Sequence, residues 1–385
     1  MRMVHTYQGR TLEGVSVEVT VEGSIIRSVR PLQSESPLPL IAPPLVDLQQ
    51  NGALGRAFNQ LHEDPTVLTT VAAHVRRHGV GRLLATFTTY PYERQRESLA
   101  EFNRQLSADR DLERLYCGAF FEGIYMSREE GWCGAHPPEY MRDPNWREWA
   151  ALHEASGGRI RLFNIAPERP HAIETIREAV RHGLRVAMGH CGPDADTIRR
   201  AVDAGADLVT HLGNGAPTLV HRHRNPFWTW LADERVKIGL IADGVHLPGD
   251  FLLAAIAAKG RDKVYLVSDA SWFSGMPAGD YGGFMIVESG VCRLKGALAG
   301  SWFQADRCVE RMCELEWPLA DAWRQQSVTP AKILGLPLPG LAAGEPAEFV
   351  LASWSPHEGL RLEQVVALGR ELLDEPVRPK TIFSK

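Results

Sequence analysis

Short apolar segments alternate with stretches of helical spacing, and this alternation limits the possible folds more than any other feature. The intervening stretches, such as DADTIRRAVDAGA and LPGDFLLAAIAAKG, carry helical periodicity. Because neighbouring parallel strands need a crossover helix between them, eight such units predict a (β/α)8 barrel of the TIM type. The eight apolar segments are LVDLQ (45–49), RLLATFTT (82–89), YCGAFFEG (116–123), IRLFNIAP (160–167), LRVAMGHCG (184–192), ADLVTHLGNG (206–215), VKIGLIADG (236–244) and KVYLVSDAS (263–271).

The two ends of the chain have a different pattern of apolar and polar residues. GVSVEVTVEG near the start and GEPAEFVLASWSP near the end alternate as strands with one wet face do. We therefore expect residues 1–44 and 336–385 to form one small β-sandwich domain beside a barrel of residues 45–335. A doubly wound open sheet is the rival fold, but no G-x-G-x-x-G follows the first apolar segment.

Composition narrows the class of protein. The formal charge of −5 and the scattered Lys and Arg give no electrostatic basis for binding nucleic acid or an anionic membrane. The six cysteines form no C-x-x-C pair, which is typical of reduced thiols. The opening residues lack the apolar core of a signal peptide. These features predict a soluble, cytoplasmic protein with a small-molecule partner.

Polar residues stand where four of the apolar segments end. Glu122 ends AFFEG, His190 ends VAMGH, His211 ends LVTH and Asp269 ends YLVSD. In a barrel, all C-terminal strand ends meet at one mouth, so these residues should converge. One carboxylate and two imidazoles suit a zinc-type ion with a position left for water. An aspartate nearby could then take and return the protons of an amide hydrolysis.

Each of these residues also has an ordinary structural interpretation. A histidine at a strand end can be a hydrogen-bonded structural residue, Asp269 could cap the following helix, and Glu122 could pair with an arginine. Cys191, next to His190, is interpreted as packing because it has no paired base. Four such residues at four strand ends favour a metal site.

The sequence resembles the N-acetylglucosamine-6-phosphate deacetylases of the amidohydrolase superfamily across nearly its whole length. The resemblance rests on eight segments. Taken singly, only the GH…THL-x-N and ADG-x-H segments are specific, but the order and spacing of all eight together are characteristic of the family. The matching segments are LVDLQQNG (45–52), FEGIYMSREEGWCGAH (121–136), GHCGPDADTIRRAVDAGADLVTHLGNGAP (189–217), IADGVH (241–246), VSDAS (267–271), GMPAGDY (275–281), LAGS (298–301) and TPAKILGL (329–336).

The resemblance implies a role for each matching residue. Glu122, His190 and His211 would hold one divalent metal ion, and Asp269 would be the catalytic base and then the acid. These ligands accept zinc, iron, manganese or cobalt, with zinc the first expectation. The residues expected to contact the substrate are His136, His246 (also a catalytic candidate), Asn214, Gly215 and either Arg222, which the spacing favours, or Arg224, which the R-x-P pattern favours. In the family, the residues that match Asn214, Gly215 and the arginine help to bind the sugar phosphate. Because that arginine often reaches the site of a neighbouring subunit, a homodimer is implied.

The chain departs from the family pattern in two places. Gln49 and Asn51 stand where many superfamily members have H-x-H, so we expect a single ion, with both amides as packing or support. Trp272, Phe273 and Trp302 stand near the expected mouth, where they could stack on a substrate ring or merely pack under the loops.

Three functions remain open from the sequence. The leading one is deacetylation of an N-acetylated amino sugar, as its 6-phosphate or a close relative, to acetate and a free amine. The second keeps the metal and Asp269 but acts on another N-acyl compound or a cyclic amide. The third, a non-catalytic binding relative, is disfavoured because all three ligands and the acid–base group are present.

Overall fold

Eight parallel strands form the centre of the computed structural model, which describes residues 4–286 and 290–379. Each of the eight apolar segments overlaps one of them, so the barrel prediction is confirmed. The last strand returns to the first through a parallel bridge between Gln50 and Ala270, which closes the barrel. In order around the sheet, the strands are β5 (Leu45–Gln50), β8 (Val80–Phe87), β9 (Tyr116–Phe121), β10 (Ile160–Ile165), β11 (Arg185–Met188), β12 (Leu208–Val209), β13 (Lys237–Ile241) and β14 (Val264–Val267).

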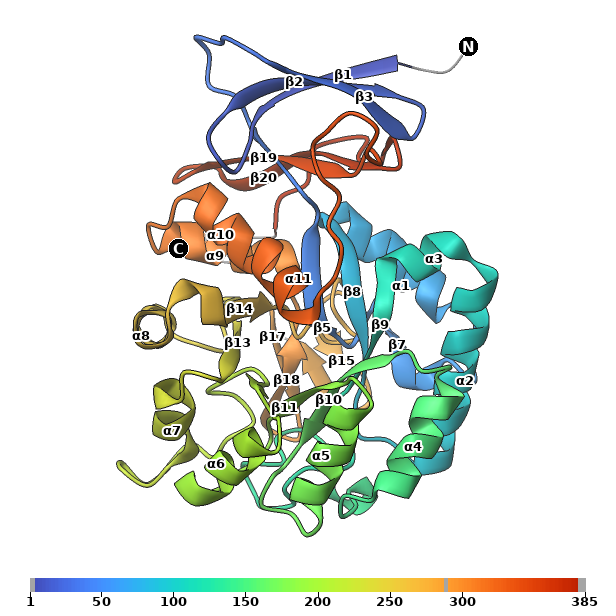
Figure 1. Ribbon diagram of the computed structural model, residues 1–385, viewed down its shortest axis with the longest axis vertical. Coiled ribbons are helices and arrows are strands. Elements are labelled where there is room, and N and C mark those ends of the chain that lie inside the picture. The colour runs from blue at the N-terminus through green and yellow to red at the C-terminus, as the bar shows by residue number, and fades with distance from the viewer. Residues whose placement is uncertain (1–3, 287–289, 380–385) are drawn as a thin grey trace.

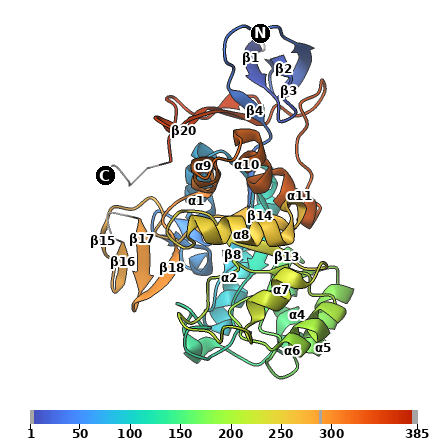
Figure 2. The same cartoon turned by 90° about the vertical axis from the view of Figure 1, so that its left-hand side faces the viewer.

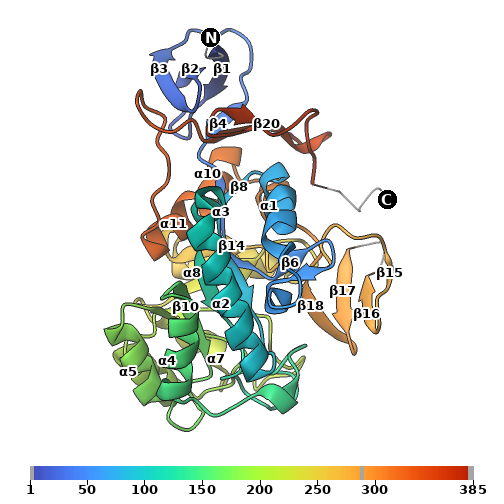
Figure 3. The same ribbon diagram turned by 90° about the vertical axis from the view of Figure 1, so that its right-hand side faces the viewer.

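Helices cover the outside of the barrel (Figures 1 and 3). In α1, Val67, Val71 and Val75 recur every four residues, so the helix presents one buried apolar face to the strands. The helices are α1 (Val67–Arg77), α2 (Tyr92–Ala108), α3 (Arg110–Leu115), α4 (Trp146–Ala155), α5 (Ala172–Arg181), α6 (Ala195–Asp203), α7 (Pro226–Ala232), α8 (Gly249–Lys259), α9 (Ala305–Glu314), α10 (Leu319–Gln326) and α11 (Val328–Leu334), with 3-10 turns at Phe58–Gln60, Pro138–Tyr140 and Arg261–Lys263.

The barrel interior is closed at the N-terminal ends of the strands. Inward side chains such as Leu48, Phe120 and Leu162 pack together with Ile333 and Leu334 of α11. Arg161 and Arg185, near the starts of β10 and β11, donate to the carbonyls of that same helix. Because α11 plugs this end, only the C-terminal mouth is left for a ligand.

Both chain ends contribute to a separate seven-stranded sheet, as predicted. Figure 1 shows its two parts above the barrel, with β19 and β20 lying between the barrel and β1–β3. The two parts share an apolar cluster that includes Val19, Ile26 and Phe349. The boundaries at residues 44/45 and 335/336 stay a prediction. The strands are β21 (Arg370–Glu371), β20 (Gly359–Ala367), β19 (Phe349–Ser355), β4 (Leu40–Ala42), β1 (Val4–Arg10), β2 (Ser16–Glu22) and β3 (Ile25–Pro31), in that spatial order.

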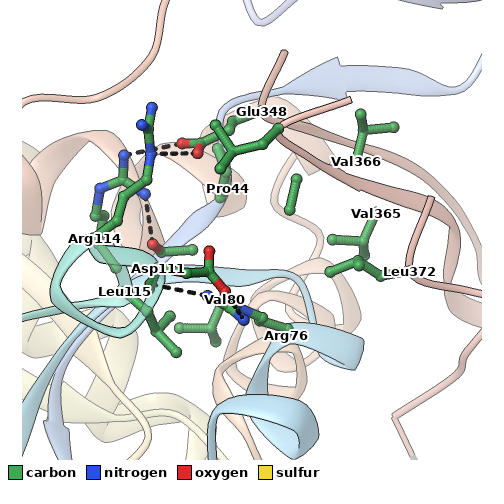
Figure 4. Close-up of a pocket in the computed structure, with 14 residues that line it drawn as sticks. Pro44, Arg76, Val80, Asp111, Arg114, Leu115, Glu348, Val365, Val366 and Leu372 are labelled. Carbon is green, nitrogen blue, oxygen red and sulfur yellow. Dashed lines mark hydrogen bonds and ion pairs between the residues drawn. The ribbon is translucent and has the colours of Figure 1, made fainter. Parts of the chain in front are cut away.

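A buried ion-pair cluster joins this sheet to the barrel (Figure 4). Glu348, just before β19, accepts from Arg82 at 2.9 Å and pairs with Arg114 at 2.5 Å. These groups line a cavity of about 30 Å³, the size of a water molecule. The cavity lies at the N-terminal end of β8, away from the mouth, so it is no candidate for the substrate site.

A small four-stranded sheet follows β14 and was not predicted from the sequence. It consists of β15 (Gly279–Asp280), β16 (Phe284–Ile286), β17 (Val291–Leu294) and β18 (Ala297–Ser301). Figure 2 shows it to one side of the barrel. A short hairpin of β6 (Gly52–Ala53) and β7 (Arg56–Ala57) follows β5. Within the described ranges, no helix combines the length and the apolar character that a membrane span requires.

Candidate active site

Four polar side chains meet at the C-terminal mouth of the barrel. Glu122 directly follows β9, while His190, His211 and Asp269 each stand two residues beyond β11, β12 and β14. The last three have left-handed backbone angles, with φ of 53°, 29° and 46°. Non-glycine residues adopt this region at a cost, and such strain gathers at functional sites where the surrounding structure enforces it.

The side chains of Glu122, His190 and His211 form a compact buried cluster. Glu122 Oε1 lies 3.1 Å from His211 Nε2 and 3.6 Å from His190 Nε2, and the two Nε2 atoms are 3.1 Å apart. The three side chains are 2%, 7% and 3% exposed. Ligand atoms bonded to a tetrahedral zinc-type ion lie about 3.3 Å from one another. The spacing therefore fits a divalent metal ion.

His136 adds a third imidazole to this region. Ligand atoms of Glu122, His136 and His190 all lie within 4.8 Å of one another, so these three residues also form a group that could hold a metal ion. The rings of His136 and His190 meet edge to face, with centroids 4.5 Å apart. His136 Nδ1 lies 3.0 Å from Thr89 Oγ1, a partner that the sequence did not suggest.

Electrostatics at the cluster favour an anionic Glu122 carboxylate and a neutral His136 ring. Burial opposes ionisation of Glu122, but hydrogen bonds from His190 and His211 hold the pKa of its carboxyl well below the usual range. Burial, reinforced by the neighbouring His190, lowers the pKa of His136 to about 3. His136 is therefore a neutral ring at physiological pH, able to act as a ligand or a hydrogen-bonding group.

Two amides of β5 and its end support the carboxylates. Gln49 Nε2 donates to Glu122 Oε1 at 2.7 Å, and Asn51 Nδ2 donates to Asp269 Oδ1 at 2.7 Å. The residues at the H-x-H positions thus act as support, as the sequence analysis proposed. Each amide fixes the direction of a carboxylate that would otherwise be free to rotate.

Asp269 has the properties of a proton-transfer group. Burial and, to a smaller extent, the negative charge of the nearby Glu122 raise the pKa of its carboxyl to about 6. An acid near neutrality can both accept and return a proton, which is what hydrolysis of an amide requires. The alternative of a helix cap is not what the structure presents, because Asp269 precedes no helix directly.

His246 follows β13 and is held by an aspartate that the sequence analysis overlooked. Its Nδ1 lies 2.8 Å from Asp243 Oδ2. Burial lowers the pKa of His246, but the adjacent Asp243 carboxylate, helped by the nearby Asp269, raises it above the usual value. The three-residue spacing in ADGVH was the available signal for Asp243.

The predicted phosphate-binding residues lie beyond this cluster. Asn214 turns its amide back to the carbonyl of His211 at 3.4 Å. Gly215, with φ of 58°, lies against the His190 ring, and a Cβ there would be 2.7 Å from Nδ1. Arg222 and Arg224 are exposed, and in the described part of the chain neither donates to a site residue. The structure thus gathers the metal and proton-transfer candidates but not the two arginines.

The aromatic residues beyond β14 pack mainly against each other. The rings of Trp272 and Phe273 are 4.0 Å apart, and Phe273 also meets Phe284 at 4.4 Å. Trp302 Nε1 donates to Met276 O at 2.8 Å. Together they form the apolar core under β15–β18. Cys191 is fully buried, and burial raises the pKa of its thiol far above the usual value, which fits packing better than reactivity.

Comparison with known proteins finds amino-sugar-phosphate deacetylases that match nearly the whole chain. N-acetylgalactosamine-6-phosphate deacetylase of Escherichia coli O157:H7 is 31% identical over 92% of this chain and 94% of its own. N-acetylglucosamine-6-phosphate deacetylase of Vibrio furnissii is 28% identical, covering 98% and 95%. The crystal structure of N-acetyl-D-glucosamine-6-phosphate deacetylase from Mycobacterium smegmatis, 29% identical, superimposes with a TM-score of 0.83 over 96% of this chain and 100% of that one. No protein-family model matches the sequence.

Proposed function

Because the chain belongs to the N-acetylglucosamine- and N-acetylgalactosamine-6-phosphate deacetylase family of the amidohydrolase superfamily, we propose that it hydrolyses the acetamide of an N-acetylated amino sugar 6-phosphate to acetate and a free amine. The observation that carries this proposal is the buried cluster of Glu122, His190 and His211 beside Asp269. A carboxylate, two imidazoles and an acid near neutrality are the groups that metal-assisted amide hydrolysis uses.

In this proposal, Glu122, His190 and His211 hold one divalent ion, with zinc the expected metal. A bound ion of this kind supplies a Lewis acid that activates water and polarises a carbonyl. His136 stands next to the cluster and offers a further imidazole. It is assigned to the acyl group of the substrate, where a neutral ring can hydrogen-bond to the carbonyl oxygen.

Asp269 carries the proton through the reaction. Its carboxylate removes one proton from the attacking water as the new carbon–oxygen bond forms. The resulting acid returns that proton to the amide nitrogen as the carbon–nitrogen bond breaks, so that acetate and the amine leave. His246 is assigned to a hydroxyl or acyl oxygen of the sugar. Asn51 keeps Asp269 aimed at the cluster throughout.

The phosphate is assigned to Asn214, Gly215 and an arginine supplied by a second copy of the chain. Arg222 and Arg224 project from an exposed segment that also carries the exposed side chains of Leu219 and Trp228. Such a segment suits contact with another subunit. The proposal therefore includes a homodimer, and a cytoplasmic location suits its phosphorylated substrate.

The decisive experiment is turnover of N-acetylglucosamine 6-phosphate and N-acetylgalactosamine 6-phosphate by metal-loaded protein, measured as acetate and primary amine. We expect release of both products in equal amounts, and Asp269→Asn should reduce kcat by about 10²- to 10⁴-fold. Asp262→Asn, which changes an exposed aspartate, is the matched control and should leave kcat unchanged. Turnover of unrelated N-acyl amines but of neither sugar phosphate would refute the proposed substrate.

A further inference from the structure

A buried aspartate organises the loop that follows β13. Oδ1 of Asp243 accepts from the backbone N–H groups of Val245 and His246 at 2.8 and 2.9 Å. Oδ2 lies 2.8 Å from His246 Nδ1 and accepts from Ser301 Oγ, also at 2.8 Å. The carboxylate thus meets four donors, and the side chains of Asp243 and His246 are only 1% and 4% exposed.

The same contacts leave one ring atom of His246 available. With Nδ1 taken by Asp243, only Nε2 can hydrogen-bond to another molecule. In the described ranges, the ring makes its one hydrogen bond through Nδ1, to Asp243. His246 also stands near Asp269 and His211, so this free atom belongs to the region of the proposed chemistry.

Ser301 connects this pair to the acid–base residue. It ends β18, and its N–H donates to Asp269 O at 2.8 Å while its hydroxyl donates to Asp243. Its carbonyl accepts from Ser271 N at 2.6 Å. The last residue of the small inserted sheet therefore fixes the position of Asp243 relative to the segment that follows β14.

We propose that Asp243 is a positioning residue, which fixes the tautomer and ring direction of His246 so that Nε2 faces the substrate. Ser301 holds the aspartate in place. The assignment of Nε2 to a substrate hydroxyl or acyl oxygen rests on the proposed function, whereas the fixed tautomer does not. In this arrangement Asp243 touches no reacting atom and acts only through His246.

Burial would raise the pKa of Asp243, but the adjacent imidazole and the backbone donors bring it to about 2, so the group is ionised at all physiological pH values. An ionised carboxylate has no proton to offer, and the neutral ring must therefore keep its proton on Nδ1. An asparagine at this position behaves differently. Its oxygen can replace Oδ1, while its NH2 group must then donate to Nδ1 and move the ring proton to Nε2.

Nitrogen-15 NMR of histidine-labelled, zinc-loaded protein tests this directly. The spectrum is recorded at alkaline pH, where the ring is neutral, and the His246 signals are identified by their loss in His246→Gln. We expect the Nδ1–H tautomer in the unaltered protein and in Ser301→Ala, and the Nε2–H tautomer in Asp243→Asn. The unaltered protein alone suffices to overturn the proposal, since an Nε2–H tautomer there contradicts it even if Asp243→Asn fails to fold.

Kinetics supply the second measurement. Asp243→Asn should lower kcat/KM by about 10- to 100-fold, as loss of an orienting partner does, with bound metal unchanged. Combining it with His246→Gln should add no further loss, because both changes remove the same contact. Additive losses would refute action through His246. Absence of turnover in every form would instead refute the proposed function and leave the NMR result to stand.

Discussion

Asn51 donates a 2.7 Å hydrogen bond from its side-chain amide to Asp269 Oδ1, so the end of the first barrel strand holds the proposed acid–base residue at the end of the last. The same two segments are joined through the backbone, where Asn51 N donates to Ala270 O at 3.0 Å. The residue that helps to close the barrel therefore also orients the side chain of Asp269. Any change in β5 that disturbs this join should affect catalysis.

Replacing Asn51 should move the pH dependence of the reaction. Burial and Glu122 raise the pKa of Asp269 to about 6, and the hydrogen bond from Asn51 opposes them by stabilising the charged form. Asn51→Leu removes that donor, so the pKa rises further and more of Asp269 is protonated at a given pH. The acid limb of the kcat/KM profile should therefore shift to higher pH, with the alkaline limb less affected.

Gln49→Leu provides the comparison, because Gln49 donates to Glu122 instead of Asp269. This change should leave the acid limb near its original position. An acid limb that stays in place in Asn51→Leu would contradict the assignment of Asp269 as the group that must be ionised.

Metal content should follow the three-residue cluster. Purified protein should bind one divalent ion per chain, and a chelator should abolish turnover until a divalent metal is restored. His211→Asn should reduce bound metal below one equivalent, since His211 Nε2 lies 3.1 Å from Glu122 Oε1 and from His190 Nε2. Gln49→Leu should instead weaken metal affinity by about 10- to 100-fold, as loss of an outer hydrogen bond does.

Elemental analysis during titration with metal distinguishes these outcomes. Two equivalents per chain in the unaltered protein would contradict the single site. Full metal occupancy in His211→Asn would point instead to Glu122, His136 and His190, the other group whose ligand atoms lie together.

The sequence was most informative where strands are buried and continuous. Segments such as 82–89 and 116–123 are nearly uninterrupted apolar runs because β8 and β9 are buried on both faces, and Glu122 stands out as the polar residue that ends such a run. Even β12, which has two residues, was found through the LVTH pattern. Because a strand that is buried on both faces requires apolar residues, a run of apolar residues predicts such a strand.

The sheet β15–β18 and the role of Asp243 were missed for physical reasons. Strands of two to five residues between glycines carry no periodic signal, and this sheet is stabilised by rings such as Phe273 and Phe284 that come from different segments. The spacing in ADGVH places Asp243 beside His246, but the contact that holds Asp243 comes from Ser301, 58 residues away, and no local pattern encodes it. The choice between Arg222 and Arg224 belongs to an exposed loop, where packing imposes no residue type.

Gly215→Ala should damage the site through contact with His190. The added Cβ would lie 2.7 Å from His190 Nδ1, closer than a Cβ atom approaches a nonbonded neighbour, so the imidazole must move. Gly335→Ala is a matched control because Gly335 has nearly the same left-handed φ (60° against 58°) but no atom within 4 Å of the added carbon. Both changes should cost roughly 1–2 kcal/mol of stability through backbone strain.

Only Gly215→Ala should also lose bound metal and turnover. Elemental analysis and kinetics at a temperature where both variants are folded test this difference. Equal metal content and equal turnover in the two variants would contradict a close approach of residue 215 to His190.

Glu348→Gln should weaken the attachment of the terminal sheet without altering the mouth of the barrel. Glu348 is 5% exposed and pairs with Arg82 and Arg114, so the substitution leaves two guanidinium groups without their anion in a mostly buried position. Removing one partner of a buried ion pair costs about 3–5 kcal/mol. Because Arg114 is 34% exposed and can recover some hydration, we expect a loss of about 3 kcal/mol in the free energy of unfolding.

Urea unfolding of Glu348→Gln, followed by circular dichroism, measures this loss. Glu97→Gln is the control, since its partner Arg94 and Glu97 itself are 54% and 47% exposed and such pairs contribute less than about 1 kcal/mol. Metal content and kcat should be unchanged in both variants below the transition, because Glu348 lies at the opposite end of the barrel from Asp269. A Glu348→Gln protein as stable as Glu97→Gln would show that apolar packing alone holds the terminal sheet to the barrel. A loss of kcat without a loss of stability would show that the terminal sheet affects the structure of the barrel mouth.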